Sequence, residues 1–279
     1  MTVYTTLITA EQLSAQLDTA EWRIVDCRFD LADAALGERQ YRENHLPGAI
    51  YAHLDREMSD KVDGLNRGRH PLPSRETTRL RFEALGIGDG TQVVAYDASG
   101  GTYAARLWWM LRWIGHPAVA VLDGGYDAWV AAGLPVSAEP GMPRAAQLSL
   151  LHSDARLASA SDIEAIVASG AEQIVDARAP DRFAGRNETI DPVAGHIPGA
   201  INRFYKDNLD DAGRFKDAAT LRREFEALSG GRDVVHQCGS GVTACNNLLA
   251  ARIAGLAEGR LYAGSWSDWI TDPKRPIAT

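Results

Sequence analysis

Short apolar runs alternate with longer amphipathic stretches along the chain. The runs are rich in valine and isoleucine, and they include residues 24–25, 93–95, 174–175 and 234–235. Stretches with helical periodicity, such as residues 106–112 and 221–228, stand between these runs. Continuous apolar runs of this kind predict strands that are buried on both faces, as in a parallel sheet covered by helices. The pattern therefore predicts an α/β fold in which βα units surround a mostly parallel sheet.

The two halves of the chain carry the same signatures in the same order. His-Leu-Pro-Gly-Ala-Ile at residues 45–50 returns as His-Ile-Pro-Gly-Ala-Ile at residues 196–201. Ile-Val-Asp-Cys-Arg at residues 24–28 returns as Ile-Val-Asp-Ala-Arg at residues 174–178. Residues 93–100 match the segment around Cys238, with Asp97 in the place of Cys238, and Trp129 matches Trp269. Several matched signatures in one order predict a duplicated domain and not a solenoid.

We expect two tandem domains, residues 1–138 and 151–279, joined by a linker at residues 139–150. A length of 279 residues fits about two domains of roughly 100–200 residues each. Residues 137–143 include two prolines and a glycine and show no apolar periodicity, which is typical of a linker. Because Asp97 offers no nucleophilic sulfur, we expect the first domain to be catalytically silent and the second, with Cys238, to be the catalytic one.

Composition and charge exclude several classes of partner. The chain has 29 basic and 37 acidic residues, a net charge of −8, which disfavours nucleic acids and anionic membranes. With 45% hydrophobic residues the chain can build ordinary cores, but no apolar run approaches the roughly 20 residues that cross a bilayer. Residues 1–5 lack both a basic start and a long apolar stretch, so no secretory signal is evident. The sequence therefore predicts a cytoplasmic protein.

Cys238 ends an apolar run and opens a glycine-rich loop. Gly239, Ser240 and Gly241 follow it, and a helical stretch begins near Thr243. The glycines let successive backbone N–H groups turn inward, and the start of the helix adds positive potential at the same point. Such surroundings stabilise a thiolate, which is the nucleophilic form of cysteine, and equally a persulfide or a bound anion. The alternative, a structural cysteine at a strand end, needs no glycine loop after it.

The other two cysteines favour packing roles. Three cysteines cannot all pair, and none of them stands in a Cys-x-x-Cys spacing. Cys27 occupies the position of Ala177 in the second repeat, which indicates a small core residue. Cys245 follows Cys238 by about two helical turns. We expect it to be packed, with a redox role as the alternative.

The segment Cys-Gly-Ser-Gly-Val-Thr-Ala at residues 238–244 resembles the active-site loop of rhodanese-type sulfurtransferases. It is the version typical of 3-mercaptopyruvate sulfurtransferases, whereas thiosulfate-preferring relatives usually carry Arg and Lys where this chain has Gly239 and Ser240. The resemblance extends over essentially the whole chain and implies two tandem rhodanese-like domains. A Cys-dependent phosphatase would share the entry from His236 to Cys238 but would need an arginine at the position of Ala244 to clamp phosphate.

The resemblance implies a proton relay beside the cysteine. In mercaptopyruvate sulfurtransferases the loop serine is assisted by a histidine and an aspartate from the first domain. The matching residues are Ser240, His70 and Asp55. Such a relay handles the proton that a pyruvate enolate leaving group needs. The alternative for Asp55 and His70 is an ordinary pair in a surface loop.

The resemblance also implies a binding site for the donor anion. Arg182 falls where the family places a substrate-binding arginine, and the second arginine of many relatives would fall at Asp191. Arg186 is the candidate substitute, with a solvated loop charge as its alternative. Four residues of the loop complete the predicted substrate site: Gly239, Gly241, Val242 and Thr243.

Residues that recur in both halves are expected to be structural, because only one half carries the thiol. His45 and His196 form one such pair. Arg28 and Arg178 form another, and we expect each to pair with its neighbouring aspartate. Trp266 and Trp269 are expected to pack near the loop as core and wall, with no cofactor role.

The implied reaction is a double displacement with ping-pong kinetics. The Cys238 thiolate takes the outer sulfur of a small-molecule donor, releasing pyruvate or sulfite, and the persulfide passes its sulfur to cyanide or to a small or thioredoxin-like protein thiol. No cofactor or metal is expected, because the glycine loop lacks the Lys-Ser/Thr of a phosphate-binding loop and no ligand cluster is evident. Thiosulfate sulfurtransferase is the alternative enzyme, and a non-enzymatic sulfur-carrier or binding module is the alternative from another class.

Overall fold

The structure is a computed structural model that describes residues 2–17, 19–62 and 67–279. The chain divides into two compact units. The first contains Met1–Ser59, Pro73–Asp154 and Asp211–Phe215, and the second contains Asp60–Leu72, Ala155–Asp210 and Lys216–Thr279. A short segment of the N-terminal half therefore belongs to the second unit. The predicted domain boundaries at residues 138 and 151 stay a prediction.

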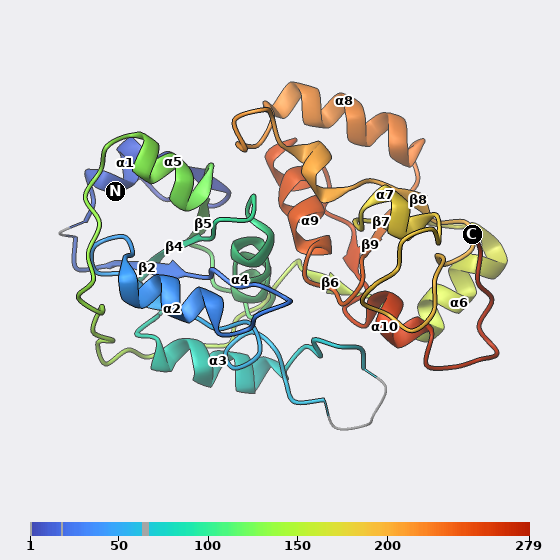
Figure 1. Cartoon of the computed structure of the whole chain (residues 1–279), viewed down its shortest axis with the longest axis horizontal. Coiled ribbons are helices and arrows are strands. Elements are labelled where there is room, and N and C mark those ends of the chain that lie inside the picture. Colours follow the sequence, from blue (N-terminus) through green and yellow to red (C-terminus); the bar gives the residue numbers. More distant parts are fainter. Residues whose placement is uncertain (1, 18, 63–66) are drawn as a thin grey trace. The chain divides into compact units, whose positions relative to one another are not determined.

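Each unit is built around a five-stranded sheet (Figure 1). The first sheet has the order β1-β5-β4-β2-β3 and the second has the order β6-β10-β9-β7-β8. All pairings between these strands are parallel. The strands of the first sheet are β1 Leu7–Ile8, β2 Trp22–Asp26, β3 Ile50–Tyr51, β4 Gln92–Tyr96 and β5 Val119–Leu122. Those of the second are β6 Arg156–Leu157, β7 Gln173–Asp176, β8 Ile201–Asn202, β9 Val234–Gln237 and β10 Arg260–Leu261.

Helices flank both sheets. In the first unit they are α1 Ala10–Ser14, α2 Leu36–Glu43, α3 Arg75–Ala84, α4 Thr102–Trp113 and α5 Gly125–Ala131. In the second they are α6 Ala160–Ser169, α7 Pro180–Phe183, the 3₁₀ helix η1 Tyr205–Asn208, α8 Ala218–Ser229, α9 Ala244–Ile253 and α10 Ser265–Trp269. The amphipathic stretches 106–112 and 221–228 lie within α4 and α8, as predicted. The predicted fold, a mostly parallel sheet flanked by helices in each half, is confirmed.

Local sequence signals set the ends of the helices. Asp217 begins α8 by accepting the backbone N–H of Thr220, and Gly230 ends it with a φ of 58°. A side-chain acceptor at the start satisfies an N–H that lacks a partner within the helix. Glycine at the end takes a left-handed conformation that other residues adopt only at a cost. Ser159 and Gly170 bound α6 in the same way.

The duplication extends to the packing of each core. Trp129 and Trp269 are both fully buried, and each indole N–H donates to the carbonyl of a proline, Pro135 at 2.8 Å and Pro276 at 2.9 Å. The repeats therefore match in their side-chain contacts as well as in strand order. No helix within the described ranges is both long and apolar enough to cross a membrane.

Candidate active site

Cys238 directly follows β9, the middle strand of the second sheet. Ligands of parallel sheets bind at this carboxyl edge. Cys238 is 1% exposed, and the backbone N–H of Gly241 points at its Sγ at 3.1 Å. Gly241 has a φ of 77°, and a Cβ there would clash with the carbonyl oxygen of Ala263. Only glycine fits this position, so the loop is built to aim a backbone N–H at the sulfur.

The end of the loop leads into α9. Val242 is buried, and Thr243 directly precedes the first residue of the helix. The carbonyls of Val242 and Thr243 accept the backbone N–H groups of Cys245 and Asn246, each at 3.1 Å. These bonds fix the turn between the thiol and the helix. The expected role of Val242 and Thr243 in substrate binding stays a prediction.

The matching loop of the first unit holds a carboxylate in the same kind of cradle. Asp97 accepts hydrogen bonds of 2.7–3.0 Å from the backbone N–H groups of Ser99, Gly101, Tyr103 and Ala104. Burial raises the pKa of the Asp97 carboxyl above its ordinary value, and these four N–H groups oppose the rise. The backbone of this loop therefore binds an anion. The loop of Cys238 is its counterpart in the second unit, so it is suited to bind an anion at the position of the thiol.

The start of α10 fixes the backbone of the cysteine loop. The Cys238 N–H donates to Ser265 Oγ at 3.0 Å, and the Trp266 N–H donates to the Cys238 carbonyl at 3.0 Å. The Ser267 N–H donates to the Gly239 carbonyl at 2.9 Å. Trp266 is buried, as expected of a residue that packs near the loop. Three successive residues of α10 therefore hold the thiol and the glycine that follows it.

Sequence reasoning missed Ser265. It has a φ of 55°, the one positive φ of a residue other than glycine in the part of the chain that the structure describes. The matching residue of the first unit is Gly125, with a φ of 59°, and the Tyr126 N–H there donates to the Asp97 carbonyl at 2.9 Å. The second unit thus keeps a strained serine where the first uses glycine. Comparing the repeats at Gly-Gly-Tyr and Gly-Ser-Trp would have found it.

Ser240 and His70 lie together. Ser240 Oγ and His70 Nδ1 are 2.7 Å apart, and the two residues are 6% and 5% exposed. His70 lies in Asp60–Leu72, a segment of the N-terminal half that belongs to the same compact unit as Cys238. Asp55 belongs to the first unit, where its backbone N–H donates to His53 Nδ1 at 3.1 Å. Its relation to His70 stays a prediction.

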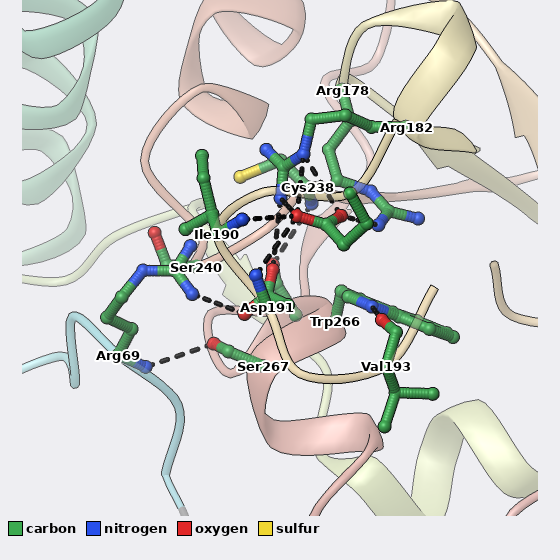
Figure 2. Close-up of polar contacts among 12 residues, drawn as sticks. Arg69, Arg178, Arg182, Ile190, Asp191, Val193, Cys238, Ser240, Trp266 and Ser267 are labelled. Carbon is green, nitrogen blue, oxygen red and sulfur yellow. Dashed lines mark hydrogen bonds and ion pairs between the residues drawn. The ribbon is translucent and has the colours of Figure 1, made fainter. Parts of the chain in front are cut away.

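Arg182 lies beside the cysteine loop. A Cβ on Gly239 would be 3.6 Å from Arg182 Nη2. Arg182 pairs with Glu188 at 2.9 Å. It also pairs with Asp191 at 3.0 Å (Figure 2). Burial alone would raise the pKa of the Glu188 carboxyl, but the Arg182 guanidinium and nearby backbone N–H groups hold it below its ordinary value. Arg186, in contrast, is exposed and makes no ion pair within the described part of the chain.

Two residues of this region were not singled out as site residues from the sequence. Glu188 and Arg69 both contact the group around Arg182: Glu188 directly, and Arg69 through its ion pair with Asp191. No local motif marks either residue, because each reaches the site only through the tertiary fold. Their contacts bring a second guanidinium to the cysteine loop.

The residues expected to be structural have structural contacts. Arg28 pairs with Asp26 at 2.6 Å and Arg178 with Asp176 at 2.7 Å. His45 and His196 each place ring Nδ1 against a backbone carbonyl, at 2.6 and 2.9 Å.

Cys27 and Cys245 are fully buried, as expected of packed residues. Burial, with the nearby Asp26 and Asp97 carboxylates, raises the pKa of the Cys27 thiol well above its ordinary value. A thiol with a raised pKa is a poor source of thiolate. Among the residues that the structure describes, no group of three or more His, Cys, Asp and Glu side chains is arranged to hold a metal ion.

Comparison with known proteins identifies the family. The profile of the rhodanese-like domain matches residues 9–132 and 159–272. The chain is 46% identical over 277 residues to the probable 3-mercaptopyruvate sulfurtransferase of Pseudomonas aeruginosa, with 98% of each protein covered. It is 37% identical over 276 residues to the putative thiosulfate sulfurtransferase SseB of Mycobacterium tuberculosis, with 97% of this chain and 96% of that protein covered.

A solved structure agrees with these relatives. The 3-mercaptopyruvate sulfurtransferase from Leishmania major matches with a TM-score of 0.81 and 32% identity, over 98% of this chain and 75% of that one. The chain therefore belongs to the rhodanese family and contains two rhodanese-like domains. The predicted class of enzyme, a sulfurtransferase, is confirmed by these relatives.

Proposed function

We propose that this protein is a 3-mercaptopyruvate sulfurtransferase that works through a persulfide on Cys238. The observation that carries the proposal is the contact of Ser240, in the loop that follows the thiol, with His70: Ser240 Oγ and His70 Nδ1 are 2.7 Å apart. A donor whose carbon leaves as an enolate needs a proton at that carbon. A hydroxyl paired with an imidazole is suited to relay one.

In the first step, the Cys238 thiolate attacks the sulfur of 3-mercaptopyruvate. A sulfur–sulfur bond forms and the carbon–sulfur bond breaks, with its electron pair moving to carbon to give the enolate of pyruvate. The proton that was on the donor thiol ends on that carbon, through Ser240 and His70. The products are pyruvate and a Cys238 persulfide anion, which the loop N–H groups stabilise.

In the second step, an acceptor attacks the outer sulfur of the persulfide. Cyanide leaves as thiocyanate, and a thiolate leaves as its own persulfide, while the bonding pair returns to Cys238 as thiolate. The acceptor class is cyanide, a small thiol or a thioredoxin-like protein in the cytoplasm. The first domain has Asp97 in place of the cysteine, so it offers no sulfur at that position and is catalytically silent.

Thiosulfate sulfurtransferase is the second candidate, because the relative SseB of Mycobacterium tuberculosis carries that name. Thiosulfate is a dianion and needs more positive charge near the thiol. Gly239 and Ser240 supply none, which favours the monoanionic donor.

One experiment separates these candidates. Steady-state kcat/KM is measured for 3-mercaptopyruvate and for thiosulfate on the same preparation, with cyanide as acceptor, and peptide masses locate the persulfide. We expect the higher kcat/KM with 3-mercaptopyruvate and a mass increase of one sulfur on the peptide that contains Cys238. A preference for thiosulfate, or a persulfide confined to Cys27 or Cys245, would overturn the proposal.

A further inference from the structure

Two guanidinium groups approach the cysteine loop at Gly239. A Cβ at this position would lie 3.1 Å from Arg69 Nη2 and 3.7 Å from Arg182 Nη1. Arg69 comes from the segment that also carries His70, and its backbone N–H donates to Ser267 Oγ at 3.0 Å, which ties the segment to α10. Both arginines therefore lie within side-chain reach of a molecule bound next to Cys238.

Carboxylates hold the outer edges of both guanidinium groups. Asp191 bridges them: Arg69 Nη1 donates to one of its oxygens and Arg182 Nη2 donates to the other, at 3.0 Å (Figure 2). Arg182 Nε donates to Glu188 at 3.0 Å. The Asp191 side chain is only 2% exposed. The bridge fixes the two arginines side by side.

On the side that faces the cysteine loop, both guanidinium groups have N–H donors without an acceptor in the described part of the chain. Arg182 Nη1 and Arg69 Nη2 make no hydrogen bond within residues 2–17, 19–62 and 67–279, and Arg69 Nε is buried without a hydrogen-bond partner there. A buried donor that lacks an acceptor destabilises the site. An anion placed beside Gly239 would supply acceptors to these donors.

The charge of the surrounding cluster favours an anion with a single charge. Its ion pairs link three arginines to three carboxylates, so the formal charges of the linked set cancel. The members are Arg69, Arg178, Arg182, Asp176, Glu188 and Asp191. A second negative charge on a ligand would face Asp191 without a further cation in this linked set.

We propose that Arg69 binds the carboxylate of the donor together with Arg182, and that Asp191 positions both guanidinium groups for it. This inference rests on the proposed function, because it names the residue that recognises the carboxylate of a 2-oxo acid donor. Arg69 then takes the place that the sequence had offered to Arg186. Gly239 leaves room for this guanidinium, since a Cβ there would lie 3.1 Å from Arg69 Nη2 and would require that side chain to shift.

The test compares two donors that differ only in the recognised group. 3-Mercaptopyruvate carries the carboxylate, and mercaptoacetone has a methyl group instead. In Arg69→Ala we expect the KM for 3-mercaptopyruvate to rise ~10–100-fold and kcat to change less than ~3-fold, as for a lost charge-assisted contact. The KM for mercaptoacetone should stay within ~2-fold, since that donor makes no such contact. Arg69→Lys should restore part of the affinity.

The matched control is Arg260→Ala. Arg260 is also partly buried and paired with a carboxylate, Glu172, at 2.5 Å, but it lies on β10 and has no contact with the loop among the ion pairs described. Its substitution should change neither KM. Equal losses with both donors in Arg69→Ala, or an unchanged KM for 3-mercaptopyruvate, would refute the role of Arg69.

A second measurement keeps this inference separate from the proposed function. Pyruvate should slow the alkylation of Cys238 by iodoacetamide in the natural protein, and the concentration needed should rise ~10–100-fold in Arg69→Ala. If the protein does not turn over 3-mercaptopyruvate but shows this protection, the proposed function fails and the carboxylate site stands. Equal protection in both proteins, or none in either, overturns the assignment of Arg69.

Discussion

The strain at Ser265 has a use that the first repeat does not need. Gly125 holds the same left-handed backbone without strain, whereas Ser265 gains an Oγ that accepts the N–H of Cys238 at 3.0 Å and donates to the Tyr262 carbonyl at 2.9 Å. A left-handed residue other than glycine costs about 1–3 kcal/mol. We infer that this hydroxyl positions the thiol.

Ser265→Gly should therefore lower the activity of the protein and leave its stability nearly unchanged. Relief of the strain offsets the lost hydrogen bonds, so we expect the free energy of unfolding to change by less than about 1 kcal/mol. Turnover with 3-mercaptopyruvate should fall ~3–30-fold, because the Cys238 N–H loses its acceptor. Urea unfolding and steady-state kinetics on the same sample check both values.

The control for this substitution is Gly125→Ala in the first unit. It should destabilise the protein, since a Cβ there would clash with the Asp97 carbonyl oxygen. Full turnover in Ser265→Gly would show that the serine is only structural.

Ser240 and His70 are expected to act as one unit in the proposed relay. Ser240→Ala and His70→Ala should each lower turnover with 3-mercaptopyruvate by ~10²–10⁴, the range of a lost acid–base step. The double variant should lose little more than either single one, because the two losses share one path. Cys238 should still react with iodoacetamide in all three. Additive losses would mean that the two side chains work separately.

Residue identities could be predicted where one local motif determines them. Cys238, Ser240 and Arg182 each stand in a motif whose spacing is visible in the chain, and the structure gathers them at one sheet edge. Arg69 could not be predicted in this way, and Ser265 could be found only by comparing the two repeats. Their roles depend on contacts with Asp191 and with the Cys238 backbone, which only the folded chain brings together.

At the scale of the element, β9 carries a buried histidine directly before the site. His236 is 1% exposed, and burial lowers its pKa from 6.5 to about 3. The matching residue on β4 is Ala95, so the strand does not need a histidine for its own geometry. In the folded protein His236 stays neutral through the physiological range. The unfolded chain, with an ordinary pKa, takes up a proton below about pH 6.5.

This difference predicts a loss of stability in mild acid. Because the unfolded state binds more protons between pH 6.5 and pH 3, the free energy of unfolding decreases as the pH falls through that window. From about pH 7 to about pH 5 the contribution of His236 amounts to about 2 kcal/mol. Urea unfolding at both pH values measures it. His236→Leu should show a smaller difference between the two, and an equal difference would assign the acid sensitivity to other groups.

At the scale of the whole molecule, the duplication made most of the fold predictable. Matched signatures such as residues 24–28 and 174–178 predicted two α/β halves, and both sheets have the same strand order. The assignment of Asp60–Leu72 to the second unit could not be predicted from linear repeats. Long-range contacts decide it, including Arg69 with Asp191 and His70 with Ser240, and neither pair is close in sequence.

The two matched loops have different roles: we expect the Asp97 loop to stabilise the fold and the Cys238 loop to carry the reactive thiol. The carboxylate of Asp97 accepts hydrogen bonds from four backbone N–H groups, whereas among the described residues one N–H, that of Gly241, points at the sulfur of Cys238. Asp97→Ala leaves those four donors buried without their acceptor, so we expect the free energy of unfolding to fall by about 3–5 kcal/mol. Cys238→Ala, the matched variant, should cost only about 1–2 kcal/mol while abolishing turnover.

Thermal or urea unfolding of both variants measures the difference in the free energy of unfolding. Persulfide formation in folded Asp97→Ala shows whether the chemistry at Cys238 is kept. We expect Asp97→Ala to keep its persulfide on Cys238, since the first repeat offers no sulfur at the matching position. The folded fraction of that variant must be held constant, because a destabilised first loop lowers total activity without touching the chemistry. Equal destabilisation by the two substitutions would mean that Asp97 contributes no more to stability than Cys238 does.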